Sequence, residues 1–215
     1  MDETVTALPD TWGLYVQSAY ANAGFCSKKS TEFYNDTAKL YDQLARPEVW
    51  LAPELVSEYA RQLWEPMKAT RHARILDFGA GTGQLGLQLK EKGFTDVDAV
   101  EPAEAMLAEV TPGLYQKTFL DGNEAPEAAY DMIVSTGVIG THVGAEGVRE
   151  LMPKVQNGGS IIFSCKYDAY LTMDFKSLET TADGPWQQTI VHGPVALVRD
   201  MPDQQHVVVE LKQKR

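Results

Sequence analysis

The sequence predicts an α/β fold built on a doubly wound, mostly parallel sheet. From residue 74 onward, short apolar runs alternate with amphipathic stretches of helical period, and a glycine-rich turn follows the first run. Strands that alternate with helices imply parallel pairing. Two β-branched runs close the chain and predict an antiparallel pair at the end of the sheet. A chain of 215 residues is long enough to bury a full core as one compact domain.

The composition argues against several classes of protein. With 19 basic and 30 acidic residues the net charge is −11, which suits neither non-specific nucleic-acid binding nor an anionic membrane surface. The 2 cysteines and 4 histidines are scattered, so neither a disulfide scaffold nor a metal site is expected. No apolar run approaches the ~18 residues of a membrane span, and the start lacks a signal-peptide pattern. We therefore expect a cytoplasmic monomer without nucleic-acid, membrane or metal partners.

The first third of the chain predicts three helices. Residues 11–23 carry aromatic side chains at helical spacing, and Ser30 is a plausible N-cap for a second helix. Pro53 suits the first position of a third helix over residues 54–64. We expect residues 1–70 to form a helical lid.

The remainder, residues 71–215, is expected to form the core. The predicted parallel strands are residues 74–78, 97–100, 115–120, 131–134 and 160–164. The predicted helices are residues 83–92, 103–110, 146–155 and 170–181, although Pro153 is unfavourable inside a helix. Residues 189–199 and 206–211 are the expected antiparallel pair, which brings the sheet to seven strands.

The strongest motif is the glycine-rich turn after the first predicted strand. Asp77 is followed by Gly79, Gly81 and Gly83, and a helix begins there. Glycines allow a sharp turn and a close approach of backbone to ligand, and the helix start offers free N–H groups. Asp77 is expected to give the pocket a negative charge, which suits an ammonium group better than a phosphate.

The same turn also fits a dinucleotide site. Residues 81–86 read Gly-Thr-Gly-Gln-Leu-Gly, a literal GxGxxG, and Glu101 lies twenty positions beyond Gly81, where an acid would bind ribose hydroxyls. The glycines alone do not decide between the two ligands, and a turn without any ligand is a third interpretation. Asp77 argues against the dinucleotide, because it would repel a pyrophosphate.

Residues 75–109 resemble the cofactor-binding core of class I S-adenosylmethionine-dependent methyltransferases. Over about residues 33–196 the chain resembles, more narrowly, the methyltransferase-like proteins of the Williams–Beuren syndrome chromosome region. The strings that carry the resemblance are Phe33-Tyr34, Ala38, Tyr41-Asp42-Gln43, Ile75-Leu76-Asp77, Gly81-Thr82-Gly83, Met106-Leu107, Pro112-Gly113-Leu114-Tyr115-Gln116 and Asn157-Gly158-Gly159. A C-terminal hairpin is typical of these methyltransferases and not of dehydrogenases. The resemblance implies a Rossmann-like fold, a mostly parallel seven-stranded sheet and an N-terminal helical lid.

The resemblance also implies which residues bind S-adenosylmethionine. The methionine part would lie against Asp77, Gly79, Ala80, Gly81, Thr82 and Gly83, and the ribose against Glu101. The adenine would lie between Pro102 and Met106 and be recognised by Asp121, Gly122 and Asn123. Ser135, Thr136 and Gly137 would lie beside the sulfonium, and Tyr34 and Tyr41 in a helix that closes over the cofactor. Core packing is the alternative role for the two tyrosines and Met106, and a turn cap is the alternative for Asp121.

The activity implied is transfer of a methyl group to a small-molecule acceptor, leaving S-adenosylhomocysteine. The protein mainly has to align the acceptor and exclude water. A base is needed only for a protonated acceptor, and His142 is the candidate, with an uninvolved loop histidine as the alternative. The loop at residues 135–138, Ser-Thr-Gly-Val, lacks the signature of nucleic-acid amino methylation. A non-catalytic cofactor-binding module and an NAD(P)-dependent oxidoreductase remain as alternatives.

Overall fold

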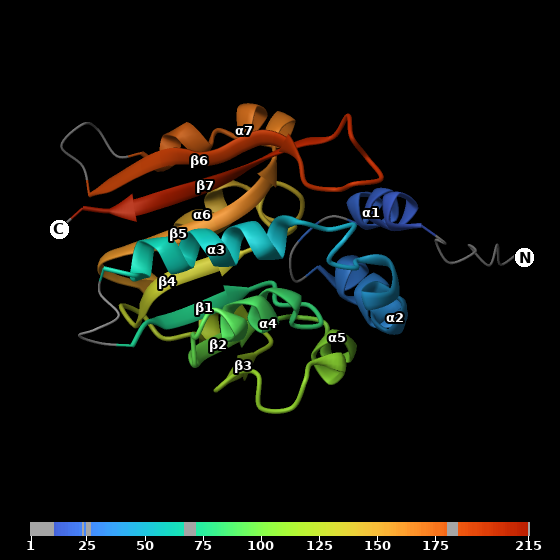
Figure 1. Ribbon diagram of the computed structural model, residues 1–215, viewed down its shortest axis with the longest axis horizontal. Coiled ribbons are helices and arrows are strands. Elements are labelled where there is room, and N and C mark those ends of the chain that lie inside the picture. The colour runs from blue at the N-terminus through green and yellow to red at the C-terminus, as the bar shows by residue number, and fades with distance from the viewer. Residues whose placement is uncertain (1–10, 23, 25–26, 67–71, 180–184, 215) are drawn as a thin grey trace, which may run out of the picture.

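The computed structural model describes residues 11–22, 24, 27–66, 72–179 and 185–214 (Figure 1). Its centre is a seven-stranded sheet in the order β3-β2-β1-β4-β5-β7-β6. The strands are β1 (Arg74–Phe78), β2 (Asp96–Val100), β3 (Thr118–Phe119), β4 (Tyr130–Ser135), β5 (Val155–Lys166), β6 (Trp186–Ala196) and β7 (Gln205–Gln213). β1 to β5 run parallel, and β7 is antiparallel to both β5 and β6. The predicted fold class is confirmed.

Helices α3 (Ala52–Trp64) and α4 (Gln84–Glu91) cover one face of the sheet. Val56, Ala60 and Trp64 on α3 pack with Ile75 of β1 in one apolar cluster. Pro53 occupies the start of α3, as predicted. α3 falls within the range expected to form the lid, yet its apolar side is part of the sheet's own core.

The opposite face of the sheet is covered by later segments of the chain. These are α6 (Ala145–Leu151), η2 (Met152–Lys154), α7 (Tyr167–Thr172) and η3 (Phe175–Leu178). Leu76, the neighbour of Ile75, packs on this side, because successive side chains of a strand point to opposite faces. The sheet is therefore buried on both faces, which explains why its central strands are almost continuously apolar.

Helices α1 (Trp12–Ala21) and α2 (Lys28–Leu44) lie beyond the carboxyl ends of the parallel strands, and α2 lies next to α5 (Glu104–Glu109) (Figure 1). Trp12 and Tyr15 of α1 share an apolar cluster with Trp50 and Val198. Ala38 of α2 packs with residues of α5 in a smaller cluster. α1 and α2 thus form a roof over the edge of the sheet where ligands of α/β proteins bind.

The predicted start of the second helix and the predicted extent of the third strand are wrong. α2 begins at Lys28, and the Oγ of Ser27 accepts a hydrogen bond from the backbone N–H of Ser30 (3.2 Å), so Ser27 is the N-cap. Residues 27–30 contain two serines, and the sequence pattern does not show which of them caps the helix. The third predicted strand, residues 115–120, is shorter than expected: β3 spans Thr118–Phe119 and pairs with β2 at these two residues.

Two predicted helices are also shorter than expected. α6 ends at Leu151, and Pro153 lies in the 3-10 turn η2, because proline cannot continue an α-helix. The helix expected over residues 170–181 is divided into α7 and η3 by Asp174, whose φ of +51° breaks the helical path. Residues 180–184 lie outside the described part of the chain.

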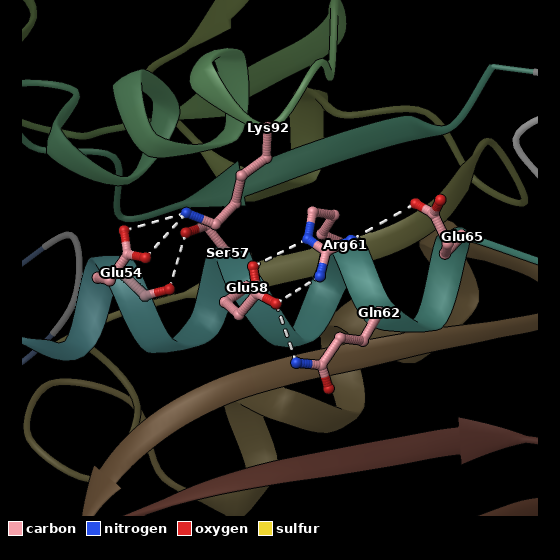
Figure 2. Close-up of polar contacts among 7 residues, drawn as sticks. All are labelled: Glu54, Ser57, Glu58, Arg61, Gln62, Glu65 and Lys92. Carbon is pink, nitrogen blue, oxygen red and sulfur yellow. Dashed lines mark hydrogen bonds and ion pairs between the residues drawn. The ribbon is translucent and has the colours of Figure 1, made fainter.

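The outer side of α3 carries a row of polar contacts (Figure 2). The carboxylate of Glu58 accepts hydrogen bonds from Arg61 and Gln62, and Glu54 pairs with Lys92 at the end of α4 (3.0 Å). Exposed ion pairs contribute little to stability, so the apolar side of α3 holds it in place. None of the helices in the described segments is long and apolar enough to cross a membrane.

We expect Trp64→Ala to lower the free energy of unfolding by about 3–5 kcal/mol, because it removes a buried indole from the sheet core. Gln62→Ala, on the exposed side of the same helix, should change it by less than about 0.5 kcal/mol. Urea unfolding measures both. Equal, small effects would mean that α3 does not depend on its packing against the sheet.

Candidate functional site

A cavity lies between the roof of α1 and α2 and the carboxyl edge of the sheet. It holds about 930 Å³ of empty space, counting the part open to solvent. Among the residues that the sequence singled out, it is lined by Tyr34, Tyr41, Gly79, Gly81, Glu101, Pro102, Met106, Thr136, Gly137 and His142. The fold therefore gathers segments that are far apart in the sequence into one site.

Two glycines of the turn after β1 are required by packing. Gly79 has a φ of +76°, and a Cβ there would collide with the side chain of Val138. Gly83 has a φ of +90°, and a Cβ there would lie 2.8 Å from Leu114 Cδ2. Gly81 (φ +55°) lines the cavity, so its bare backbone is open to a ligand.

Glu101 follows β2 and lies against this turn, as its spacing predicts. Its carboxylate accepts hydrogen bonds from the backbone N–H groups of Gly81 and Ala103, both 2.9 Å long. Burial raises the pKa of Glu101 to about 7, although the two N–H donors act in the opposite direction. Each carboxylate oxygen can accept a further hydrogen bond. Glu101 can therefore bind a pair of hydroxyl groups in the cavity.

Asp77 is not among the residues that line the cavity. Its buried carboxylate accepts a hydrogen bond from the hydroxyl of Tyr115 (2.6 Å) and one from the backbone of Gly86. Burial raises its pKa to about 7. A buried carboxylate is stable only when hydrogen-bond donors surround it, and Tyr115 and the backbone of Gly86 supply these donors to Asp77. Gly86 makes this possible, because a side chain there would collide with Tyr115.

Ala80, Thr82 and Gly83 also lie outside the cavity lining. Thr82 donates a hydrogen bond to Asp42 of α2 (2.5 Å), and Gln84 donates to the same carboxylate oxygen (2.9 Å). Asp42 thus fastens the roof to the start of α4. Sequence reasoning used Asp42 only as part of a family string and missed this role.

The residues predicted to recognise adenine lie in a second hollow. Asp121, Gly122 and Asn123 line it together with Phe78, and it shares His142 with the main cavity. Asp121 accepts a hydrogen bond from the N–H of Asn123 (2.9 Å) and so caps η1 (Gly122–Glu124). The structure brings this group to the neighbourhood of the cavity but not to its wall.

Ser135 ends β4 and is fully buried away from the cavity, and its Oγ has no hydrogen-bond partner within the described chain. Thr136 and Gly137, the next two residues, do line the cavity. The predicted sulfonium-side group is therefore divided: its last two members reach the ligand space, and its first belongs to the core.

His142 is tied to the roof. Its Nε2 shares a hydrogen bond with the hydroxyl of Tyr34 (2.8 Å), and the two rings pack edge to face. Burial lowers the pKa of His142 to about 4, so the ring is neutral near pH 7. Its Nδ1 is buried and has no hydrogen-bond partner in the part of the chain that is described.

Tyr41, another residue of the cavity wall, packs edge to face against Trp12. Burial raises the pKa of Tyr41, so its hydroxyl is neutral near pH 7.

The far end of the cavity was missed by sequence reasoning. Trp50, Cys165, Lys166 and His206 line it, and they come from the segment before α3 and from β5 and β7. The pairing of β5 with β7 sets Lys166 opposite His206. The predicted hairpin contained this information, but no local motif marks these residues.

Removing the Tyr115 hydroxyl should weaken the fold in a pH-dependent way. The hydroxyl lowers the pKa of Asp77 by stabilising its carboxylate, so Tyr115→Phe should lower the free energy of unfolding by about 1–3 kcal/mol when Asp77 is ionised. The loss should be larger at pH 8.5 than at pH 5.5, because Asp77 is mostly protonated below its pKa of about 7. Urea unfolding at both pH values tests this. An equal loss at both would contradict it.

Comparisons with known proteins show what the chain is similar to. The methyltransferase domain family matches residues 50–146. Plantazolicin methyltransferase BpumL, solved in complex with a triazolic desmethylPZN analog and SAH, superposes with a TM-score of 0.62 at 14% identity, over 95% of this chain and 97% of that one. Ribosomal protein L11 methylase from Lactobacillus delbrueckii subsp. bulgaricus gives 0.54 at 14% identity, over 74% and 78%. Residues 50–146 thus match a methyltransferase domain, and the chain has the Rossmann-like fold of these solved methyltransferases, in agreement with the resemblance seen in the sequence.

Two individual proteins of similar sequence are described as methyltransferases or methyltransferase-like. Methyltransferase-like protein 27 of Homo sapiens is 28% identical over 172 residues, which span 76% of this chain and 69% of that protein. An uncharacterized methyltransferase of Staphylococcus carnosus (strain TM300) is 35% identical over 77 residues, 36% of each chain.

Proposed function

We propose that this protein binds S-adenosylmethionine and transfers its methyl group to a small-molecule acceptor. The observation that carries the proposal is Glu101. It is a buried carboxylate, fixed by two backbone N–H groups, at the wall of a cavity that also exposes the glycine turn. This combination suits a ligand with vicinal hydroxyls and a cationic part.

The donor set of the cavity fits this cofactor. Glu101 would accept hydrogen bonds from the ribose hydroxyls, Pro102 and Met106 offer apolar contact to a base, and Gly79 and Gly81 would contact the methionine part. Lys166 is the only Lys or Arg among the described residues of the lining, and it lies on β5, away from the glycine turn. A diphosphate at the turn would therefore meet Glu101 without a compensating cation.

The bound cofactor would supply an electrophilic methyl group, and the protein would supply alignment and a water-poor site. Tyr15, Tyr41 and Trp50 form much of the wall. The described parts of the roof and the sheet edge together surround the cavity with aromatic rings, which favour an organic acceptor over water.

A small acceptor is favoured by the shape and charge of the site. The roof is fastened to the turn after β1 through Asp42 and to the loop after β4 through Tyr34. A pocket covered in this way suits a molecule that enters it whole. The net charge of −11 gives a nucleic-acid strand no electrostatic attraction.

Cofactor affinity should depend on the ionisation of Glu101. The carboxylate can accept from both ribose hydroxyls, and protonation removes one acceptor. Since the pKa of Glu101 is about 7, the affinity for S-adenosylhomocysteine should rise between pH 6 and pH 8. Glu101→Gln should weaken binding by about 1–3 kcal/mol at pH 8 and flatten the pH dependence.

Titration calorimetry measures these affinities. Glu104→Gln is the matched control, because Glu104 is exposed on α5 a few residues away. Equal binding by wild type and Glu101→Gln would remove the ribose role of Glu101.

Turnover separates the proposal from its alternatives. Incubation of the full chain with methyl-labelled S-adenosylmethionine and a small-molecule cell extract should give a labelled product of low mass. Firm cofactor binding without any labelled product would favour the non-catalytic module. Tight NAD binding without S-adenosylhomocysteine binding would favour the oxidoreductase.

A further inference from the structure

The cavity extends further along the sheet edge than the cofactor site. It reaches from Glu101, which follows β2, to His206 on β7. These two strands are separated by β1, β4 and β5. At ~4.8 Å between neighbouring strands, the four steps span about 19 Å. The end at β5 and β7 is therefore left for a second ligand.

That end combines aromatic and apolar groups with the polar side chains of Lys166 and His206. Trp12, Trp50 and Val198 line it and belong to one apolar cluster. Trp12 and Trp50 lie with their ring centroids 6.1 Å apart. An aryl ring could bury one face against this aromatic wall.

His206 adds a polar atom of defined character to this end. Its Nδ1 bonds the backbone carbonyl of Gln204 (3.1 Å), and a carbonyl oxygen can only accept, so Nδ1 carries the proton. Burial lowers the pKa of His206 to about 4, so the ring is neutral near pH 7. Nε2 then presents a lone pair, and within the described residues no donor bonds to it. The ring is held edge to face against Trp50, with centroids 5.9 Å apart.

His142, the other histidine of the cavity, cannot play this part in the same conformation. Its Nε2 is bonded to Tyr34, and its Nδ1 is buried from solvent. The two imidazoles are both neutral, but His206 has the nitrogen that is open to a ligand.

We propose that His206 Nε2 accepts a hydrogen bond from an uncharged aryl hydroxyl of the methyl acceptor, whose ring packs against the aromatic wall that Trp50 forms beside His206. The inference rests on the proposed function, because it assigns the second ligand of that site. A hydroxyl satisfies the lone pair of a neutral imidazole, and an aryl ring fits the aromatic walls. His206 thereby determines which end of the acceptor enters the cavity.

Phenol and anisole form a matched pair of probes, because anisole has the same ring but no hydroxyl proton. Their affinities for the full chain saturated with S-adenosylhomocysteine can be measured by NMR titration. One neutral hydrogen bond predicts that phenol binds about 3–10-fold more tightly than anisole. The ratio should fall to about 1 in His206→Phe and remain unchanged in His192→Phe, an exposed histidine of β6.

A second measurement uses the wild-type chain and does not depend on the folding of a variant. With histidine labelled by ¹⁵N, free His206 should show the tautomer protonated at Nδ1, and phenol should shift its Nε2 signal, whereas anisole should not. A phenol-to-anisole ratio near 1 in the wild type, or a phenol shift confined to His142, would overturn the inference. Failure of the wild type to bind S-adenosylhomocysteine would instead contradict the proposed function.

Discussion

The carboxylate of Glu101 is the constraint on which the site depends. It accepts one hydrogen bond from a backbone N–H of the turn after β1 and one from a backbone N–H of the segment after β2. These two bonds hold the neighbouring loops together. A carboxylate this deeply buried is tolerable only when such donors are in place. The same arrangement leaves acceptor capacity directed at the cavity. One interaction therefore holds the floor of the cavity together and keeps a hydrogen-bond acceptor at its wall.

Asp77 shows that a similar group can have the opposite role. Both carboxylates come at or after the ends of neighbouring strands, and burial raises the pKa of both. Asp77 turns inward because Tyr115 offers it a hydroxyl and Gly86 leaves room for that hydroxyl. The sequence places acids at these positions, but it does not show which of them faces a ligand. That depends on a tyrosine 38 residues away.

Sequence patterns were reliable where local physics determines the structure. The apolar run at β1 and the spacing to Glu101 predicted correct positions, because strand periodicity and the tight glycine turn are local properties. The lengths of β3 and α7 were mispredicted. The residue pattern shows neither how far β3 pairs with β2 nor the positive φ of Asp174 that separates α7 from η3. The places of Trp50 and His206 in the cavity wall were missed for the same reason, because only the folded sheet and its roof bring them there. The contact of Asp42 with Thr82 was missed because it joins residues 40 positions apart.

The roof is joined to the rest of the site partly through a few directional side-chain contacts. Three side chains of α2 make hydrogen bonds to other segments. Tyr34 bonds to His142, and Asp42 accepts from the hydroxyl of Thr82. Asn35 accepts from the backbone N–H of Ala105. The two-sided core around β1 and β4 does not rely on these bonds. The bonds that hold the roof over the cavity are consequently distinct from the packing that holds the sheet together, so a substitution can loosen the first and leave the second in place.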